Sequence, residues 1–133
     1  FLMPNNDAKK FALDLNRFAD KVELDLSEFR KRVTLGIKQK IETKTPVDTG
    51  RLRSSFAVSD GAPSDFVPPE GNTNALGPIE ASFSAPYDTS FVTSNLPYVI
   101  AVEFGHSDQA PQGMIRVALA EMQTELEAAF GEL

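Results

Sequence analysis

The chain has 133 residues, of which 41% are hydrophobic and 24% are charged, and its formal net charge at pH 7 is −6. The length predicts one domain, residues 1–133, with enough chain to bury a core. The absence of cysteine excludes disulfides and thiolate metal sites, no apolar run is long enough to span a membrane, and a net acidic chain is poorly suited to tight DNA binding, which depends on basic contacts to phosphate.

The charge is unevenly distributed along the chain. Residues 1–53 hold 12 of the 13 Lys and Arg against 8 acids, a net of +4, whereas residues 54–133 hold only Arg116 against 11 acids, a net of −10. Opposite charge on two parts of one chain suits contact between copies, or contact with two different neighbours. A monomer whose two ends happen to differ remains the alternative.

The first predicted element is a long amphipathic helix over residues 7–44, preceded by a flexible tail over residues 1–6. Its apolar residues recur in steps of three and four, at Phe11, Leu15, Phe18, Val22, Leu26, Phe29, Val33, Ile37 and Ile41. Period-two alternation over residues 22–26, followed by the capping residue Ser27, predicts a break or kink between about Asp20 and Ser27. Pro46 ends the helix, because the residue before a proline is disfavoured in the α region.

The opposite face of this helix is basic, with Lys9, Lys10, Arg17, Lys31, Arg32, Lys38 and Lys40. Three interpretations of this face stay open: a solvated face, a contact with a partner protein, or a contact with DNA. The solvated face is favoured, because a long helix needs polar residues toward water.

Short strands and a long loop follow the helix. Residues 52–59 predict a strand with Phe56 and Val58 on one side. Residues 60–78 hold seven Pro or Gly and predict a long mobile loop. Residues 79–85 alternate and predict a second strand with Ile79, Ala81 and Phe83 on one face. Residues 87–94 leave a third strand and a loop both open.

The C-terminal part predicts one further ambiguous element and a closing helix. Residues 98–105 are apolar, and periodicity does not decide between a buried strand and a short helix. Gly105 is expected to end this element. Pro111 is expected in the first turn of an amphipathic helix capped by Asp108 or Gln109. Its apolar positions are Ile115, Leu119, Met122, Leu126, Ala129 or Phe130, and Leu133. The whole pattern predicts an α+β fold, a small antiparallel sheet with helices on one face.

Asp48-Thr49-Gly50 is the active-site tripeptide of aspartic proteases, in which two such aspartates share a proton. A homodimer would supply both of them. However, Pro46 precedes the tripeptide where that family has an apolar strand, and Arg51 beside the pair would hold both carboxylates ionised. We therefore interpret the tripeptide as a turn, in which Asp48 bonds amides two residues on and Gly50 permits positive φ.

No other catalytic or metal-binding pattern stands out. His106, the only histidine, is followed directly by Ser107 and Asp108, whereas a catalytic triad converges from different elements. One histidine without cysteine leaves no recognisable zinc site. We predict no catalytic residue, no cofactor and no metal.

Four short segments follow one another along the chain: Thr45-Pro46-Val47-Asp48-Thr49-Gly50-Arg51-Leu52-Arg53-Ser54-Ser55, Pro97-Tyr98, Val102-Glu103-Phe104-Gly105, and Ala110-Pro111 before a closing helix. Their order resembles that in the neck or tail-completion proteins of long-tailed bacteriophages. The resemblance covers residues 27–130, with His106 where the family commonly has Thr. It implies structural or interface roles for Pro46, Asp48, Gly50, Arg51, Arg53, Glu103, Phe104 and Gly105.

The resemblance also implies a non-enzymatic protein of the virion, made in the host cytoplasm. Such proteins assemble as rings, here expected to be hexameric, between head connector or stopper proteins and tail-terminator or tail-tube proteins. DNA would pass through the lumen without sequence-specific binding, and no membrane is involved. The alternative within this interpretation is a tail-terminator ring that caps the tail tube, and the remote alternative is the dimeric protease.

Overall fold

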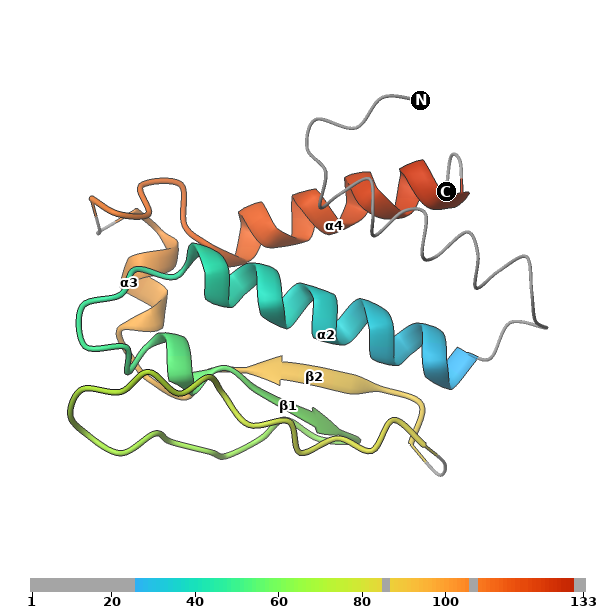
Figure 1. The fold of residues 1–133 in the computed structure, drawn as a ribbon, viewed down its shortest axis with the longest axis horizontal. Coiled ribbons are helices and arrows are strands. Elements are labelled where there is room, and N and C mark those ends of the chain that lie inside the picture. Colours follow the sequence, from blue (N-terminus) through green and yellow to red (C-terminus); the bar gives the residue numbers. More distant parts are fainter. Residues whose placement is uncertain (1–25, 85–86, 106–107, 131–133) are drawn as a thin grey trace.

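The structure is a computed structural model that describes residues 26–84, 87–105 and 108–130. Its elements are helix α2 (Leu26–Lys44), the short 3-10 helix η1 (Arg53–Ser55), strands β1 (Ala57–Asp60) and β2 (Ser90–Thr93), and helices α3 (Val99–Glu103) and α4 (Ile115–Phe130). Helix α2 lies between α4 and a two-stranded antiparallel sheet (Figure 1). The predicted α+β architecture, a small sheet with helices, is confirmed.

Helix α2 ends where the sequence predicts, at Lys44. Thr45 closes the last turn, since its amide and its hydroxyl both donate to the carbonyl of Ile41, at 2.9 and 2.6 Å. The next residue, Pro46, has no amide to continue the ladder. The expected tail over residues 1–6, the first part of the predicted helix and most of the region expected to break it lie outside the described residues.

The first predicted strand is shorter than expected. Residues 53–55 form η1 instead, because the hydroxyls of Ser54 and Ser55 bond back to the carbonyls of Arg51 and Leu52, at 2.8 and 2.6 Å. Such local bonds compete with strand pairing. The strand proper pairs with β2 in the register Ala57↔Thr93, Val58↔Val92, Ser59↔Phe91 and Asp60↔Ser90.

The strand predicted over residues 79–85 is wrong over its described part, residues 79–84, apart from one parallel bridge, Val58↔Ile79. The carboxylate of Asp60 accepts the amides of Ser82 and Phe83, at 3.0 and 2.8 Å, and Phe83 has φ +59°. The chain therefore curls around Asp60 rather than continuing beside β1. Ile79 and Phe83, which were expected on one face, do not share it: Ile79 is 57% exposed and Phe83 is 5% exposed.

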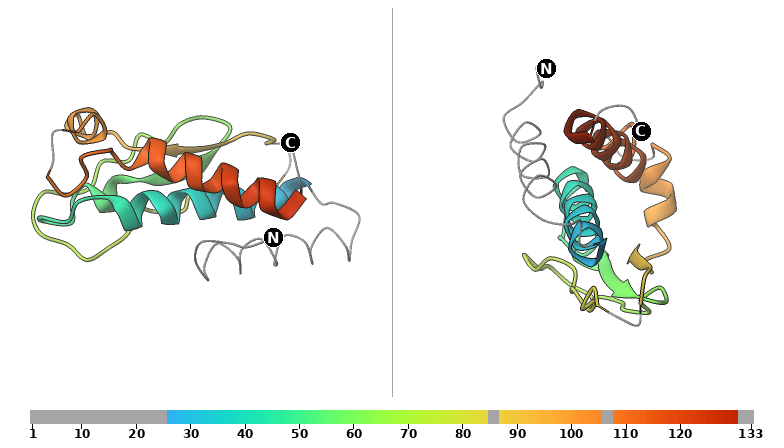
Figure 2. Two further views of the ribbon diagram at one scale, coloured as in Figure 1. Left: turned by 90° about the horizontal axis from the view of Figure 1, so that it is seen from above. Right: turned by 90° about the vertical axis from the view of Figure 1, so that its right-hand side faces the viewer.

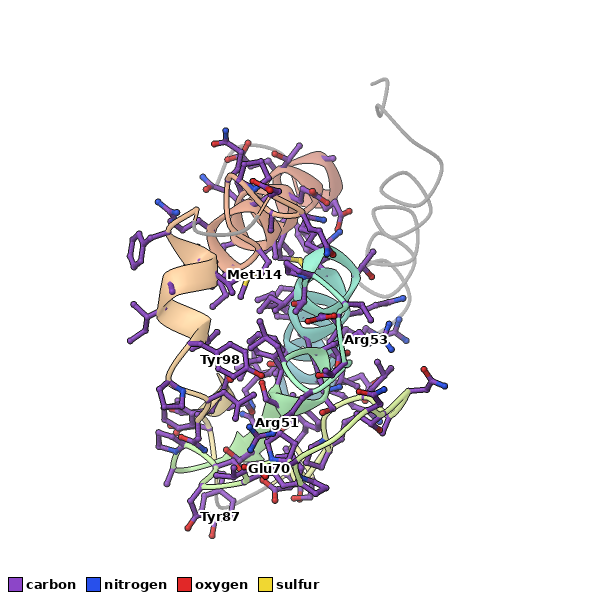
Figure 3. All side chains as sticks on the ribbon, turned by 90° about the vertical axis from the view of Figure 1, so that its left-hand side faces the viewer. Arg51, Arg53, Glu70, Tyr87, Tyr98 and Met114 are labelled. Atoms are coloured by element: carbon purple, nitrogen blue, oxygen red, sulfur yellow. The ribbon has the colours of Figure 1, made fainter. Side chains whose placement is uncertain are left out.

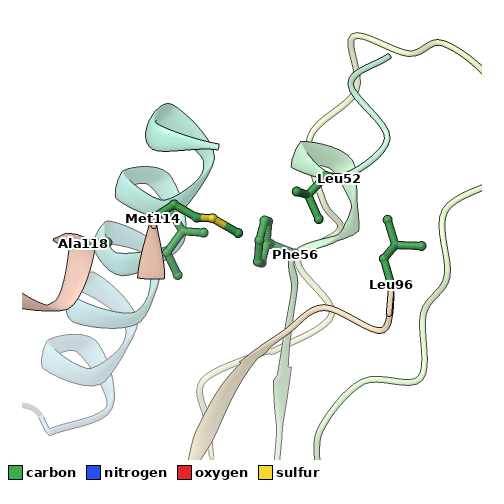
Figure 4. Packing of buried hydrophobic residues seen from close by; sticks show 6 residues of the cluster. Leu52, Phe56, Leu96, Met114 and Ala118 are labelled. Atoms are coloured by element: carbon green, nitrogen blue, oxygen red, sulfur yellow. The ribbon is translucent and has the colours of Figure 1, made fainter. Parts of the chain in front are cut away.

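The main core lies where α2, α4, η1 and the sheet meet (Figure 4). Its buried members are Ile41, Leu52, Phe56, Leu96, Met114 and Ala118. A smaller cluster joins the other ends of α2 and α4, where the rings of Phe29 and Phe130 meet edge to face at 5.7 Å. The two clusters hold α2 and α4 side by side along their length (Figure 2).

The helix faces differ from the predicted stripes. In α4 the buried residues are Ala118, Met122, Glu125 and Ala129, whereas Leu119, predicted on the core face, is 47% exposed. Small residues at the contact let two helices approach closely, which explains why alanines rather than leucine face α2. In α2, Lys38 lies in the interior, 4% exposed, although it was predicted on the solvated face.

The structure answers one question that the sequence left open and bears on one predicted loop. The apolar run over residues 98–105 contains the short helix α3, and Gly105 ends it at φ +89°. Residues 61–78 form neither helix nor strand, as expected of a loop. This loop is tied to the body: Asn95 Nδ2 donates to the carbonyls of Ser64 and Phe66, at 2.8 and 3.0 Å. Its mobility remains a prediction.

Candidate functional site

The segments singled out by the sequence lie at one end of the molecule, where α2 ends and α4 begins. We call this end the corner: residues 45–55, α3, and residues 104–105 and 108–116. Leu52 and Met114 belong to one core cluster, against which Val99 and Val102 of α3 also pack. The amide of Val47 donates to Gln109 Oε1 at 3.3 Å. Figure 3 views the molecule from this end.

The Asp48-Thr49-Gly50 tripeptide is a turn, but Asp48 does not make it. Thr49 Oγ1 accepts the amide of Arg51 at 3.2 Å, the role predicted for the Asp48 carboxylate, which is exposed. The carbonyl of Thr49 accepts the amide of Thr73 at 2.8 Å. Gly50 has φ +84°, and a Cβ there would lie 2.0 Å from the Thr73 carbonyl oxygen. Glycine is therefore required by both conformation and close approach.

The two arginines of the corner face different surroundings. Arg51 donates from Nε and Nη2 to the carbonyl of Pro68, at 3.4 and 3.2 Å, and so holds the loop over residues 61–78. The Nε of Arg53 is buried and has no hydrogen-bond partner among the described residues. Pro46 is half-buried at the end of α2.

Glu103 makes most of the contacts of the segment over residues 102–105. Its side chain accepts the amides of Met114, Ile115 and Arg116 at 2.9, 2.7 and 3.0 Å, and also Arg116 Nε at 2.8 Å. The residue is 7% exposed. It therefore caps the first turn of α4, which begins twelve residues further along the chain. The free amides and the helix dipole favour a negative charge there.

This arrangement corrects the predicted start of the last helix. The sequence suggests Asp108 or Gln109 as the cap and Pro111 in the first turn, but α4 begins at Ile115. The cap is supplied by the long-range carboxylate of Glu103, and Pro111 lies in the loop before it.

The environment of Glu103 keeps it ionised. Burial acts to raise the pKa of Glu103, but the hydrogen bonds from Ile115, Arg116 and Met114 outweigh burial and hold the pKa below its ordinary value of 4.5. The charge is needed because the carboxylate must accept at both oxygens.

Phe104 and Gly105 surround the same carboxylate. Phe104 is 63% exposed, and the guanidinium of Arg116 lies 4.8 Å from the centre of its ring. A Cβ on Gly105 would lie 2.9 Å from the Pro111 carbonyl oxygen, and one on Gly113 would lie 2.3 Å from the Glu103 carbonyl oxygen. The two glycines let the loop before α4 fold closely against α3.

The sequence interpretation missed Arg116 and Gly113 as members of this site. Arg116 carried a signal, since it is the only Lys or Arg after Arg53. Gly113 carried none, because its role is a close approach that appears only in three dimensions.

Two acidic residues outside the corner were also missed. Glu42 Oε2 accepts Lys38 Nζ at 2.8 Å and the amide of Gly77 at 3.1 Å, so a buried ion pair holds the end of the long loop. Asp60 accepts Ser90 Oγ at 2.8 Å, and Arg30 Nε donates to the same hydroxyl at 3.0 Å. Burial acts to raise the pKa of Asp60, but the bonds from Ser90, Phe83 and Ser82, with Arg30 nearby, hold it below 3.8.

The basic and acidic parts of the chain pair with each other within one molecule. Lys40 Nζ lies 2.6 Å from Glu125 Oε1 and 3.8 Å from Glu121, and Lys44 Nζ lies 2.8 Å from Glu121. Part of the charge asymmetry is therefore used between α2 and α4 rather than left for other molecules.

The hydrogen bonds of the corner hold its backbone segments against one another. A shallow hollow beside Asp48 is lined by Val47, Thr49, Asn72, Thr73 and Asn74, which bring no second carboxylate to it. No group of three or more metal-binding side chains occurs among the residues searched, those that the structure describes. His106 lies outside them. No helix in the described part of the chain is long and apolar enough to cross a membrane.

Comparisons with protein-family models, with curated proteins and with solved structures find no match to this chain.

Proposed function

We propose that this chain is a neck or tail-completion protein of a long-tailed bacteriophage, a structural protein of the virion without catalytic activity. It assembles as a ring, a hexamer in this proposal, between the head connector and the tail tube, and DNA passes through its lumen. The observation that carries the proposal is that the two sequence segments that resemble this family, residues 45–55 and 102–105, lie together in the structure. Both build one corner, in which Leu52 and Met114 share a core and Glu103 caps α4.

The surface chemistry of the corner supports contact with neighbouring proteins. Four apolar side chains near it are exposed: Val47 at 46%, Tyr98 at 42%, Ile100 at 64% and Phe104 at 63%. Exposed large apolar side chains at one end of a molecule are candidates for contact with other proteins. The net charge of −6 suits a lumen that DNA passes through, because acidic walls repel phosphate.

The proposal is tested by deleting the gene from the phage that encodes it and viewing the particles by electron microscopy. We expect filled heads and separate, finished tails, and we expect purified protein to join them when it is added back. Tails of uncontrolled length would instead identify a tail-terminator ring. Normally joined particles would refute both.

Substitutions test which groups matter. Arg51→Ala and Arg53→Ala are expected to lower head–tail joining, because both residues belong to the segment that resembles the family and Arg51 holds the loop over residues 61–78. Asp48→Asn is expected to assemble normally with no loss of peptide cleavage. Loss of a cleavage event in that variant would favour the protease instead.

A further inference from the structure

We propose that neighbouring copies of this chain join edge to edge through their sheets, the free edge of β2 in one copy pairing with residues 79–81 of the next. The inference deepens the proposed ring and rests on it. It concerns how one copy recognises another, which the corner does not explain.

The hydrogen-bond pattern identifies which backbone groups are free. Val58 directs its amide to the Pro78 carbonyl at 3.0 Å, and its carbonyl accepts the Glu80 amide at 2.7 Å. Both groups of Val58 therefore point away from β2. In an antiparallel pair, bonded and non-bonded residue pairs alternate, so Val58↔Val92 is a non-bonded pair. The amide and carbonyl of Val92 consequently point outward, to the other side of β2.

The opposite edge is free by the same reasoning. In the parallel bridge Val58↔Ile79, the bonds are made by Pro78 and Glu80, so the amide and carbonyl of Ile79 point away from β1. Alternation directs the Ala81 amide the same way. None of these outward groups bonds to another backbone group within residues 26–84, 87–105 and 108–130.

Each copy thus offers two different edges, with β1 between them (Figure 1). Natural proteins protect free edges with charge, proline or bulges, but β2 reads Ser-Phe-Val-Thr and has none of these. Residues 79–83 alternate in sequence, but Ile79 makes the only bridge of this segment among the described residues, and the chain turns toward Asp60 at Ser82 and Phe83, which leaves residues 79–81 as the second edge. Ile79 lies beside the fully buried Val58 but remains 57% exposed.

The two edges of one copy therefore fit the opposite edges of its neighbours: β2 of one copy pairs with residues 79–81 of the next. Contact between two different surfaces of identical subunits closes into a ring when the rotation allows it. In the proposed ring the strands run along the ring axis, and a rotation about that axis keeps their direction. Residues 78–80 run antiparallel to β2 within one chain, so pairing between copies is antiparallel as well.

Proline substitutions test the two edges. Val92→Pro removes an outward amide without breaking a bond to β1, and proline is tolerated on an edge of this kind. Val92→Ala is the matched control, since it removes more of the side chain but keeps the amide. Ala81→Pro blocks the other edge, and Ala81→Ser is its control. Circular dichroism establishes that each variant is folded.

The readout is the mass of the purified full-length protein by sedimentation at up to about 1 mM. We expect the wild type and both controls to associate, and each proline variant to stay monomeric. We expect a mixture of the two proline variants to form a dimer and nothing larger, because only one pair of edges remains intact. If Val92→Pro fails to fold, the proposal is tested by whether Ala81→Pro stays monomeric while Ala81→Ser associates.

Three outcomes would overturn the pairing: association of folded proline variants like the wild type, a mixture that stays monomeric, or a wild type that is monomeric throughout this range. These outcomes are separable from the proposed function, which is measured by head–tail joining in particles. Joining by a protein whose proline variants still associate would leave the function standing and remove the edge pairing.

Discussion

Glu103 and Arg116 are joined twice: Arg116 Nε donates to the Glu103 carboxylate at 2.8 Å, and Arg116 Nη2 donates to the Glu103 carbonyl at 2.6 Å. Together with three amides on the same carboxylate, this pair fastens α3 to the start of α4. We expect Glu103→Gln to destabilise the fold by about 1–3 kcal/mol, because an amide side chain cannot accept at both positions. Urea unfolding measures this.

The control for that variant is Glu80→Gln, which changes the same charge at an exposed position. We expect it to lie within about 0.5 kcal/mol of the wild type. Equal stability of the two variants would contradict the capping role of Glu103.

The pH dependence of stability follows from the lowered pKa values of Glu103 and Asp60. Each group binds a proton more readily in the unfolded chain than in the folded one, so its stabilisation is complete above the ordinary pKa values, 4.5 and 3.8. The stabilisation is lost as the pH falls through the lower folded values. We expect unfolding free energy to decrease below about pH 5.

Variants isolate the two contributions. In Glu103→Gln and Asp60→Asn the decrease should be shallower, and each variant should differ most from the wild type at neutral pH. An unchanged pH profile in both variants would show that other carboxylates cause the decrease.

The contact between α2 and α4 depends on Lys40 and Glu125. Glu125 is 3% exposed, and its Oε2 has no partner among the described residues. We expect Lys40→Met to destabilise by roughly 3–5 kcal/mol, because it leaves a buried charge without its partner. The double variant Lys40→Met/Glu125→Leu should recover much of the loss.

Lys44→Met is the matched control on the same helix. Lys44 pairs with Glu121, whose side chain is 45% exposed, so the loss should be about 0–1 kcal/mol. Unfolding free energy is measured by thermal or urea unfolding. If Lys40→Met and Lys44→Met lower it by similar amounts, the buried Lys40–Glu125 pair does not hold α2 against α4.

Gly77 marks a close approach between the long loop and the core. A Cβ there would lie 1.8 Å from the Phe56 carbonyl oxygen, so Gly77→Ala requires a backbone shift, and we expect a loss above about 2 kcal/mol. At Gly71 a Cβ would meet nothing within 4 Å, and Gly71→Ala should cost only its positive φ, about 1 kcal/mol. Reversed effects in urea unfolding would refute the close approach.

The loop itself gives a prediction on dynamics. We expect amides over residues 60–75 to exchange quickly in the free protein, with Gly61 and Thr73 slower, since their amides bond the carbonyls of Thr89 and Thr49. Hydrogen exchange followed by NMR measures this directly. Strong protection throughout the segment would show that the loop is part of the rigid body.

Local chemistry made some features predictable from the sequence. Pro46 ends α2 because it lacks an amide, and Gly50 marks a turn because it tolerates positive φ. The α+β class follows from the two periodicities along the chain. These features depend on residues close together in sequence, where sterics leave few choices.

Tertiary structure alone decided which partners the polar groups found. Glu103 caps a helix that begins at Ile115, and the Asp60 carboxylate draws Ser82 and Phe83 out of a strand that their alternation predicts. Leu119 faces outward because Ala118 fits against α2. Such outcomes depend on which segments meet in space, and no local pattern records those distances.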